Sequence, residues 1–547
     1  MSQSDKKQSF LHGAALLALA TAVVKVIGAL YKLPLNMVIG AEGYAYFTTA
    51  YEIYSVLLMV STAGLPVAMS RMISQASSLG HYNQVRRIYS VSRAIFLGLG
   101  TLSSLLMVVG CRWLAESLNQ PDAWVAILCL GPCALLMGMM ATNRGFFQGQ
   151  GNMRPTSNSQ MIEAVVKLIV GLSAAFVLLK LTSQISYAAG GAILGVTASC
   201  LVSVLYLQGR FRPAYRELPV TAETPRSFGA TAKSLLAIAI PITIGSAGLQ
   251  LLTVVETGLY MDRLVYLIET NQYMGHMVTA EISAQRAATM LKGVYNMAQT
   301  IYNMPCAFIV PITVSVIPAV TSQLTLLNDR AVKATEESAA RITGLLALPC
   351  AVGLCLLAEP IMALLGGYEG QLLEQGARCM AVLGVNAFLY AVIQNTTALM
   401  QAHGKAHVPV VNMLLAGVMK LIVVYILVGN PAIGILGAPL GSTLCLLCIA
   451  TLNLICIHTL VPQKPALLKN LLRPALPAAV MGLAVYGVRF GMERALGDNA
   501  SALLLCAVPI LVGVGVYAVG TVVFKAITRE DCQLLPKGEK IASWLHL

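Results

Sequence analysis

Apolar residues gather along the chain into long, nearly uninterrupted runs that are separated by short polar segments. A helix needs about 20 mostly apolar residues to cross the hydrocarbon core of a bilayer, whereas strands of a membrane barrel alternate apolar and polar residues over about 10 positions. The pattern therefore predicts an all-α polytopic membrane protein with 14 transmembrane helices. We expect these helices over residues 11–39, 44–70, 88–111, 123–147, 156–180, 186–208, 232–260, 288–320, 342–366, 378–402, 408–429, 433–457, 473–490 and 501–525.

The composition excludes a soluble globular protein. Of the 547 residues, 57% are hydrophobic and only 11% are charged, whereas soluble domains carry about 25% charged residues. The first apolar run follows Lys6 and Lys7 and contains Lys25 and Lys32. Because it is longer than the apolar core of a signal peptide, we expect it to be retained as a transmembrane helix.

The distribution of basic residues predicts how the helices are oriented. The net charge of +13 would suit nucleic-acid binding, but the positions of the charges follow the alternation of the predicted helices. Of the 36 Lys and Arg residues, 23 lie in segments on the side of the N-terminus, seven lie on the opposite side and six lie within the runs. Lys and Arg favour cytoplasmic loops. We therefore expect both termini in the cytoplasm, which requires an even number of helices.

Sequence matches at a constant distance indicate an internal repeat. Lys167-Leu168-Ile169-Val170 recurs 253 residues later as Lys420-Leu421-Ile422-Val423, and the same distance maps Gln148 onto Gln401. A lysine within an apolar run is rare, which makes the first match specific. The matched helices are six apart, and an even separation preserves orientation. We therefore expect two six-helix lobes related by a parallel repeat, a design in which transporters bind their substrate between the halves.

The repeat and the longest cytoplasmic segment predict the domain boundaries. We expect an N-terminal six-helix lobe over residues 1–210, a cytoplasmic linker over 211–231 and a C-terminal six-helix lobe over 232–460. A C-terminal helix pair with a cytoplasmic tail is expected over 461–547.

Ionisable residues inside the apolar runs are the candidate functional residues, because a charge in a bilayer must face protein, water or a substrate. The basic residues are Lys25, Lys32, Arg93, Lys167, Lys292 and Lys420, and the clear acidic residues are Glu52, Glu163 and Glu256. Arg93 lies near the end of its run, where its side chain can reach the interface. The remaining bases outnumber the acids, which favours an anionic substrate such as a phosphate or pyrophosphate group.

The spacing of these charges suggests how some of them are used. Lys25 and Lys32 are seven residues apart, so they share one face of a helix. Glu163 and Lys167 are four residues apart in the order that favours an ion pair, so a structural pair and a substrate role both remain open. The other acids, Glu52 and Glu256, could pair with lysines across helices, set the charge of a cavity or bind a coupling ion, Na⁺ or H⁺.

Enzymatic chemistry finds little support in the sequence. The 13 cysteines are scattered, mostly within apolar runs, as is typical of small apolar filler rather than of metal ligands. The seven histidines are dispersed, and we find no nucleotide-binding motif. An integral-membrane glycosyltransferase or polymerase would need catalytic acid or His groups at the interface and a large soluble loop. We therefore expect neither an enzyme nor a cofactor.

Three segments resemble a known family of transporters. They are Lys25-Val26-Ile27-Gly28-Ala29-Leu30-Tyr31-Lys32-Leu33-Pro34, Gly64-Leu65-Pro66-Val67-Ala68-Met69-Ser70-Arg71 and Gly145-Phe146-Phe147-Gln148-Gly149-Gln150-Gly151-Asn152-Met153-Arg154-Pro155-Thr156. Together they resemble the stage V sporulation protein B branch of the polysaccharide and peptidoglycan-precursor flippases, which is similar to the lipid II flippase. That branch belongs to the multidrug, oligosaccharidyl-lipid and polysaccharide exporter superfamily. The resemblance covers nearly the whole chain.

The resemblance implies a function. It implies a flippase that moves an undecaprenyl-pyrophosphate-linked sugar, such as a lipid II-like cell-wall precursor, from the inner to the outer leaflet by alternating access. It places the protein in a bacterial plasma membrane, in peptidoglycan or polysaccharide biosynthesis, with sporulation as one setting and a cell-wall polymerase as a possible partner. The alternative within the superfamily is a cation-coupled multidrug exporter, in which buried acids would be expected to exceed buried bases.

The resemblance also implies which residues bind the substrate. In the lipid II flippase pattern, the first helix carries two arginines six residues apart; here Lys25 takes the first position, and the second falls on Tyr31, beside Lys32. Lys25 and Lys32 are therefore expected to bind the pyrophosphate, with Lys292 as a cation from the other lobe. The further candidates are Arg71, Lys167 and Lys420.

Overall fold

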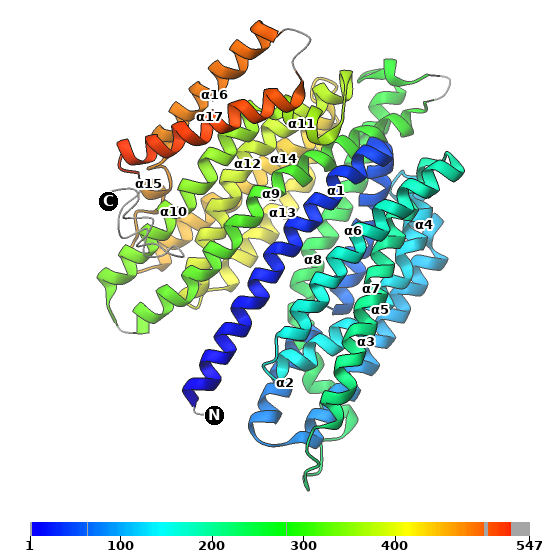
Figure 1. The fold of residues 1–547 in the computed structure, drawn as a ribbon, viewed down its shortest axis with the longest axis vertical. Helices are drawn as coiled ribbons and strands as arrows, with labels where there is room; N and C mark the ends of the chain where they lie inside the picture. The colour runs from blue at the N-terminus through cyan, green and yellow to red at the C-terminus, as the bar shows by residue number, and fades with distance from the viewer. Residues whose placement is uncertain (1–2, 63, 280–281, 326, 497–500, 527–547) are drawn as a thin grey trace. The chain divides into compact units, whose positions relative to one another are not determined.

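A computed structural model describes residues 3–62, 64–279, 282–325, 327–496 and 501–526, and in these residues all regular structure is helical (Figure 1). The helices of the first part of the chain are α1 (Gln3–Thr62), α2 (Leu65–Ser78), α3 (Tyr82–Val109), α4 (Cys111–Ser117), α5 (Trp124–Gly149), α6 (Arg154–Thr182), α7 (Ile185–Arg216) and α8 (Phe228–Glu269). The helices of the second part are α9 (Ala284–Thr325), α10 (Asp329–Leu356), α11 (Ala358–Gly366), α12 (Gly370–Ala402), α13 (His407–Val428), α14 (Gly437–Leu460), α15 (Leu467–Leu471), α16 (Ala475–Leu496) and α17 (Ala502–Val523).

The predicted apolar runs largely coincide with these helices, and the chain is a multi-pass membrane protein. The runs 44–70, 88–111 and 342–366 each cross a break, between α1 and α2, α3 and α4, and α10 and α11. Ten of the described helices are long and apolar enough to cross a bilayer; the total of 14 crossings stays a prediction. The first predicted run and most of the second lie in α1, in which two helices join at a kink at Gly40; the second run ends in α2. Gly40 has a φ of 68°, in the left-handed region that favours glycine. The kink therefore lies where the sequence predicts the connection between two helices.

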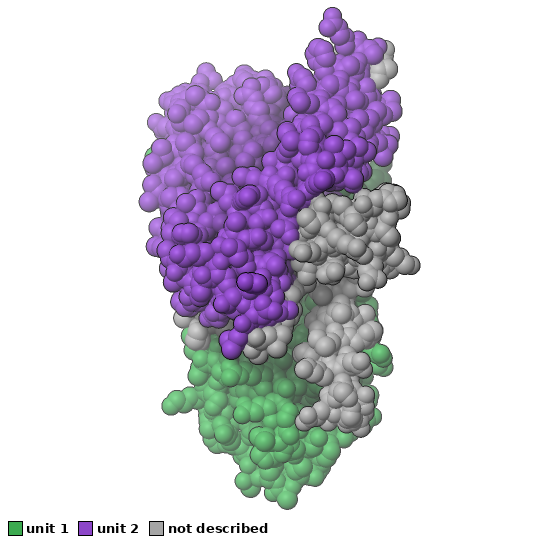
Figure 2. All heavy atoms as spheres, turned by 90° about the vertical axis from the view of Figure 1, so that its left-hand side faces the viewer, with its two compact units in different colours: residues 1–265, 278–293 green, residues 266–277, 294–547 purple. Residues whose placement is uncertain are grey.

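The chain divides into two compact units, which Figure 2 colours separately. The first unit comprises residues 1–265 and 278–293, and the second comprises residues 266–277 and 294–547. The unit boundaries therefore fall near the end of α8 and within α9, so that the first turns of α9 belong to the first unit. The predicted lobe boundaries at residues 210 and 232 rest on the sequence repeat, whereas the two units are defined by compactness. The lobe boundaries therefore stay a prediction.

The two units share a common order of helix packing. In the first unit α3 packs on α5, and α5 and α6 both pack on α7. In the second unit α10 packs on α12, and α12 and α13 both pack on α14. In α5 and α12, 56% of the residues in the most apolar 18-residue stretch are buried, whereas in α6 and α13 the share is 17%. These two pairs of equivalent helices thus occupy similar positions in their units, whereas α7 is more buried (67%) than its counterpart α14 (33%).

Polar contacts and lysine positions follow the same correspondence. Asn143 of α5 donates to Gln208 of α7 (3.2 Å), and Asn453 of α14 donates to Thr396 of α12 (3.1 Å). Each contact joins the two central helices of its unit, where an unpaired polar group would be costly in a membrane. Lys167 and Lys420 each lie 13 residues after the first residue of their helices, α6 and α13.

Candidate functional site

Two lysines of the first unit lie on helices that pack on each other. Lys32 is half-buried on α1, and Lys167 is half-buried on α6, a helix that packs on α1. Both lie next to Tyr31, which precedes Lys32 on α1 and whose ring is in contact with Lys167. Among the described residues the structure records no ion pair for either of them. Two like charges with no counter-ion in an apolar protein favour the binding of an anion.

Tyr31, which lies next to both lysines, is fixed by burial and by a hydrogen bond. Its ring is almost fully buried, and its hydroxyl donates to the carbonyl oxygen of Ala192 on α7, 3.1 Å away. The Lys167 ammonium lies 5.8 Å from the centre of the Tyr31 ring, within the range of a cation–π contact. The aromatic ring therefore offers Lys167 an attraction that leaves its positive charge uncompensated.

Glu163 does not pair with Lys167, although the two are one turn apart on α6. Its Oε2 lies 3.1 Å from Nη2 of Arg144 on α5. Arg144 is fixed at its other edge, where Nε donates to the Ser159 hydroxyl at 2.9 Å. The suggested ion pair between Glu163 and Lys167 on α6 is therefore not formed, because Arg144 on the neighbouring helix is the partner of Glu163.

Lys292 and Glu52 form a buried ion pair, as the sequence suggested for charges on different helices. The Lys292 side chain has no solvent exposure, and its Nζ lies 3.1 Å from Oε2 of Glu52. Nζ also donates to Thr49 Oγ1 at 2.6 Å, and that hydroxyl donates to Oε1 of Gln120 at 2.5 Å. The sequence gives no signal for Thr49 or Gln120, since neither carries a charge. Thr49 thus gives the Lys292 ammonium a hydrogen-bond acceptor where the side chain has no solvent exposure, and Gln120 holds the Thr49 hydroxyl.

A second charged cluster lies where α9 begins. Arg286 Nε donates to both carboxylate oxygens of Glu42, at 3.0 Å each. The Tyr46 hydroxyl donates to Glu42 Oε1 at 2.8 Å and lies 3.4 Å from an oxygen of Asp122. The hydrogen bond and the charge of Glu42 raise the pKa of Arg286 above its usual range. Glu42 could not be predicted as a buried charge, because it lies between two apolar runs, next to the kink at Gly40.

The other predicted site residues are dispersed. Arg71 is exposed on α2. Glu256 is buried on α8 and Lys420 is half-buried on α13, and each makes further interactions. The side chain of Lys25 lies outside the described residues, so its predicted pairing with Lys32 stays a prediction. Among the described residues no three His, Cys, Asp or Glu side chains are grouped to hold a metal ion.

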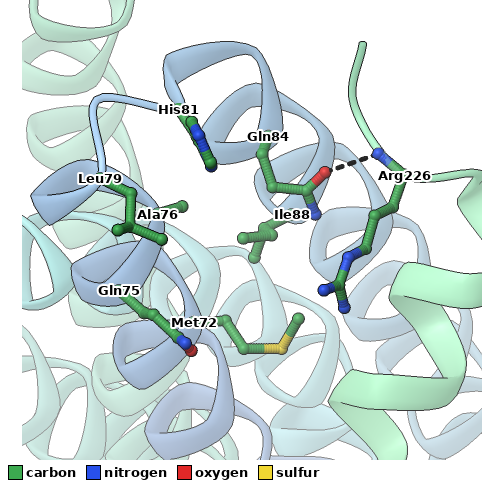
Figure 3. Close-up of a pocket in the computed structure, with 8 residues that line it drawn as sticks. All are labelled: Met72, Gln75, Ala76, Leu79, His81, Gln84, Ile88 and Arg226. Atoms are coloured by element: carbon green, nitrogen blue, oxygen red, sulfur yellow. Dashed lines mark hydrogen bonds between the residues drawn. The ribbon is translucent and has the colours of Figure 1, made fainter. Parts of the chain in front are cut away.

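The segment that links α7 to α8 is fixed onto the turn between α2 and α3. Glu223 accepts a hydrogen bond from the backbone N–H of Gln84 at 2.8 Å, and so caps the first turn of α3. The Gln84 side chain in turn accepts from the backbone N–H of Arg226 at 2.8 Å. A pocket of about 120 Å³ lies beside this contact (Figure 3). Its lining contains none of the predicted site residues, so it is separate from the lysine pair.

Two proteins of Bacillus subtilis are similar to this chain in sequence. The chain is 25% identical to "Lipid II flippase MurJ" of Bacillus subtilis (strain 168), over 75% of this chain and 76% of that protein. It is 23% identical to "Stage V sporulation protein B" of the same organism, over 97% of this chain and 98% of that protein.

Solved structures share the fold. A lipid II flippase MurJ in an inward closed conformation matches with a TM-score of 0.66 at 15% identity, over 93% of this chain and 98% of that chain. An inward-facing MATE family multidrug resistance transporter of the MOP superfamily matches with a TM-score of 0.62 at 15% identity, over 80% of this chain and 97% of that chain. At this identity, the likeness shows the fold alone.

Two family models match the sequence. The model described as "Lipid II flippase MurJ" matches residues 264–506. The model described as "Polysaccharide biosynthesis protein" matches residues 10–324, which is more than half of the 547 residues. The protein therefore belongs to the polysaccharide biosynthesis protein family.

Proposed function

We propose that this protein is a flippase that moves an undecaprenyl-pyrophosphate-linked sugar, such as a lipid II-like cell-wall precursor, from the inner to the outer leaflet. In this proposal the two relatives from Bacillus subtilis supply the substrate class, because one is named a lipid II flippase and the other a sporulation protein. The substrate combines a long apolar tail, a doubly phosphorylated link and a polar sugar. A carrier for it needs buried positive charge inside a membrane protein.

The observation that carries the proposal is the balance of charge in the first unit. Three acids there have basic partners: Glu42 with Arg286, Glu52 with Lys292, and Glu163 with Arg144. Lys32 and Lys167 remain without such a partner among the described residues. The charge available to a ligand at this point is therefore positive. A pyrophosphate would neutralise the two ammonium groups, and lysine binds phosphate as a point charge.

The proposed site extends the lysine pair by residues that the family resemblance implies. Lys25 lies two helical turns before Lys32 and would add a third cation on the same face of α1. Lys420 takes the place of Lys167 in the second repeat and is the corresponding candidate there. Lys292 is engaged by Glu52 in this structure, so it would reach a substrate only in a state that separates the two. Arg71 would act near the membrane surface.

The transport cycle follows from the parallel repeat. We propose that two six-helix lobes rock between inward-open and outward-open states, with 14 transmembrane helices and both termini in the cytoplasm, as the loop charges predict. A coupling ion, Na⁺ or H⁺, would act at Glu52 or Glu256. A cell-wall polymerase could receive the translocated substrate. The protein itself would make or break no covalent bond.

A cation-coupled multidrug exporter is the alternative, because a multidrug transporter shares the fold. The two functions make opposite demands on buried charge. An exporter of cationic drugs needs acids that are free to bind a cation, whereas three acids of the first unit are neutralised by basic partners. The alternative therefore has support from the fold but not from the charges that we describe.

Translocation in proteoliposomes tests the proposed function directly. The wild-type chain should move a fluorescent undecaprenyl-pyrophosphate disaccharide to the opposite leaflet, and a K25A variant that inserts normally should lose this activity. Cells that express the protein should show no change in susceptibility to cationic drugs. Drug export without movement of the lipid-linked probe would replace the proposal with the alternative.

A further inference from the structure

Arg144 determines which residue Glu163 can pair with. On an isolated helix, a glutamate four residues before a lysine favours an ion pair, and Glu163 and Lys167 have this spacing on α6. In the structure the carboxylate lies instead at 3.1 Å from the Arg144 guanidinium. For Lys167, the contact that the structure records among the described residues is with the ring of Tyr31, which precedes Lys32 on α1. The acid nearest to Lys167 along its helix is thus held elsewhere.

The surroundings of Arg144 fix it in this position. Its side chain is 14% exposed and that of Glu163 is 25% exposed, so the pair lies largely out of solvent. The guanidinium Nε donates to the Ser159 hydroxyl, and that hydroxyl donates to the carbonyl oxygen of Thr156 at 2.7 Å. Ser159 is itself fully buried. A planar guanidinium with two fixed partners cannot turn away from Glu163 without leaving a buried donor unsatisfied.

The second repeat offers an internal comparison. The distance of 253 residues that maps Lys167 onto Lys420 also maps Arg144 onto Thr397 and Glu163 onto Ala416. The second repeat therefore keeps the lysine but lacks both the acid and the arginine. The two charges are present together in one repeat and absent together from the other. This pattern fits an arginine whose role is to neutralise the glutamate beside a lysine that must stay available.

We propose that Arg144 is a positioning residue that keeps Lys167 free for an anionic ligand by holding Glu163 away from it. The inference rests on the proposed function, because it assumes that Lys167 binds a phosphate group. Arg144 does not touch the ligand; it acts through Glu163. Loss of Arg144 would let Glu163 turn to Lys167, form the pair that the helix spacing favours and cancel the positive charge of the site.

Zero-length cross-linking tests the switch of partners. Dicyclohexylcarbodiimide, which enters membranes, joins a carboxylate to an adjacent amine as an amide that peptide mass spectrometry detects. The wild-type chain should give no Glu163–Lys167 cross-link, whereas R144Q should give one. The Glu52–Lys292 pair, at 3.1 Å, is an internal positive control in both proteins. A cross-link at equal yield in wild type and R144Q would overturn the proposal.

Ligand binding tests the consequence, with farnesyl pyrophosphate as the probe and full-length protein in lipid nanodiscs. We expect R144Q to weaken binding about tenfold, R144K to bind within about threefold of wild type, and R144Q/E163Q to recover to within about threefold. Recovery alone would also follow from restored stability, because removing both partners of a buried pair leaves no unpaired charge. The Glu163–Lys167 cross-link separates the two roles, since a merely structural arginine does not keep the carboxylate from Lys167. If R144Q does not accumulate, R144M and R144M/E163Q make the same comparison.

The same measurement separates failure of this inference from failure of the proposed function. K167Q should weaken binding at least as much as R144Q, whereas K180Q, on the exposed end of the same helix, should not. If K167Q binds the probe as wild type does, the proposed anion site is wrong. If K167Q weakens binding but R144Q does not, or if R144Q/E163Q stays weak, only the role of Arg144 is wrong.

Discussion

The ammonium nitrogen of Lys292 lies 3.1 Å from a carboxylate oxygen of Glu52, and the Lys292 side chain is fully shielded from solvent. Thr49 accepts a further hydrogen bond from the same nitrogen, at 2.6 Å. This contact joins the first turns of α9 to α1 within the first unit. A buried pair of this kind is costly to break on one side only, because the remaining charge has no partner.

The first prediction concerns the two halves of this pair. E52Q alone and K292M alone should each destabilise the protein by about 3 to 5 kcal/mol, whereas E52Q/K292M should recover most of the loss. Thermal unfolding in detergent, followed by size-exclusion chromatography, measures the three variants. R378Q is the control, since Arg378 and Glu374 form an exposed pair on α12 that contributes about 1 kcal/mol or less. Single variants as stable as the wild type would show that the pair is not formed.

The second prediction concerns Gly293, which follows Lys292. A methyl group at this position would lie 1.7 Å from the backbone oxygen of Ala41 on α1, so α1 and α9 can approach only because Gly293 has no side chain. G293A should cost about 1 to 3 kcal/mol and speed hydrogen exchange over residues 284–293. G487A is the control, because nothing lies within 4 Å of a methyl group there. Wild-type exchange in G293A would contradict the close approach.

The third prediction concerns orientation. Gln184 directly precedes α7, and Ala222 lies in the segment that links α7 to α8; both are exposed. Because α7 separates them, they should lie on opposite sides of the membrane. A membrane-impermeant maleimide added to intact cells should label Q184C, and it should label A222C only after the membrane is opened. The wild-type chain gives the background from its native cysteines. Labelling of A222C in intact cells would invert the predicted orientation.

The helices could be predicted closely because their cause is local. The sequence predicts a helix over residues 123–147, and α5 runs over Trp124–Gly149. A long apolar run in a membrane forms a helix because a helix satisfies its own backbone hydrogen bonds. The break at Gly40 between the two helices of α1 follows the predicted connection, but its sharpness could not be predicted. The glycines and polar residues near position 40 indicate a connection, but whether the chain turns or only kinks there depends on the neighbouring helices.

The site was predictable only in part. The charges inside the apolar runs identified Lys32 and Lys167 as candidates and suggested that Glu52 pairs with a lysine of another helix, because a charge in a membrane must face protein, water or a substrate; which lysine it pairs with could not be predicted. The partner of Glu163 could not be found from spacing along α6, since Arg144 reaches it from α5. Sequence spacing describes neighbours on one helix, and the contact with Arg144 depends on how two helices pack.

The central claim is that Lys32 and Lys167 form an anion site, and a binding measurement tests it most directly. Full-length protein in nanodiscs would be titrated with farnesyl pyrophosphate and, for comparison, with uncharged farnesol. K180Q is the matched control, since Lys180 is an exposed lysine of α6 that also lies near a ring, 5.4 Å from Phe176. We predict that K32Q and K167Q each weaken pyrophosphate binding at least tenfold, that K180Q does not, and that farnesol distinguishes none of them. Equal pyrophosphate affinity in wild type, K32Q and K167Q would contradict the account.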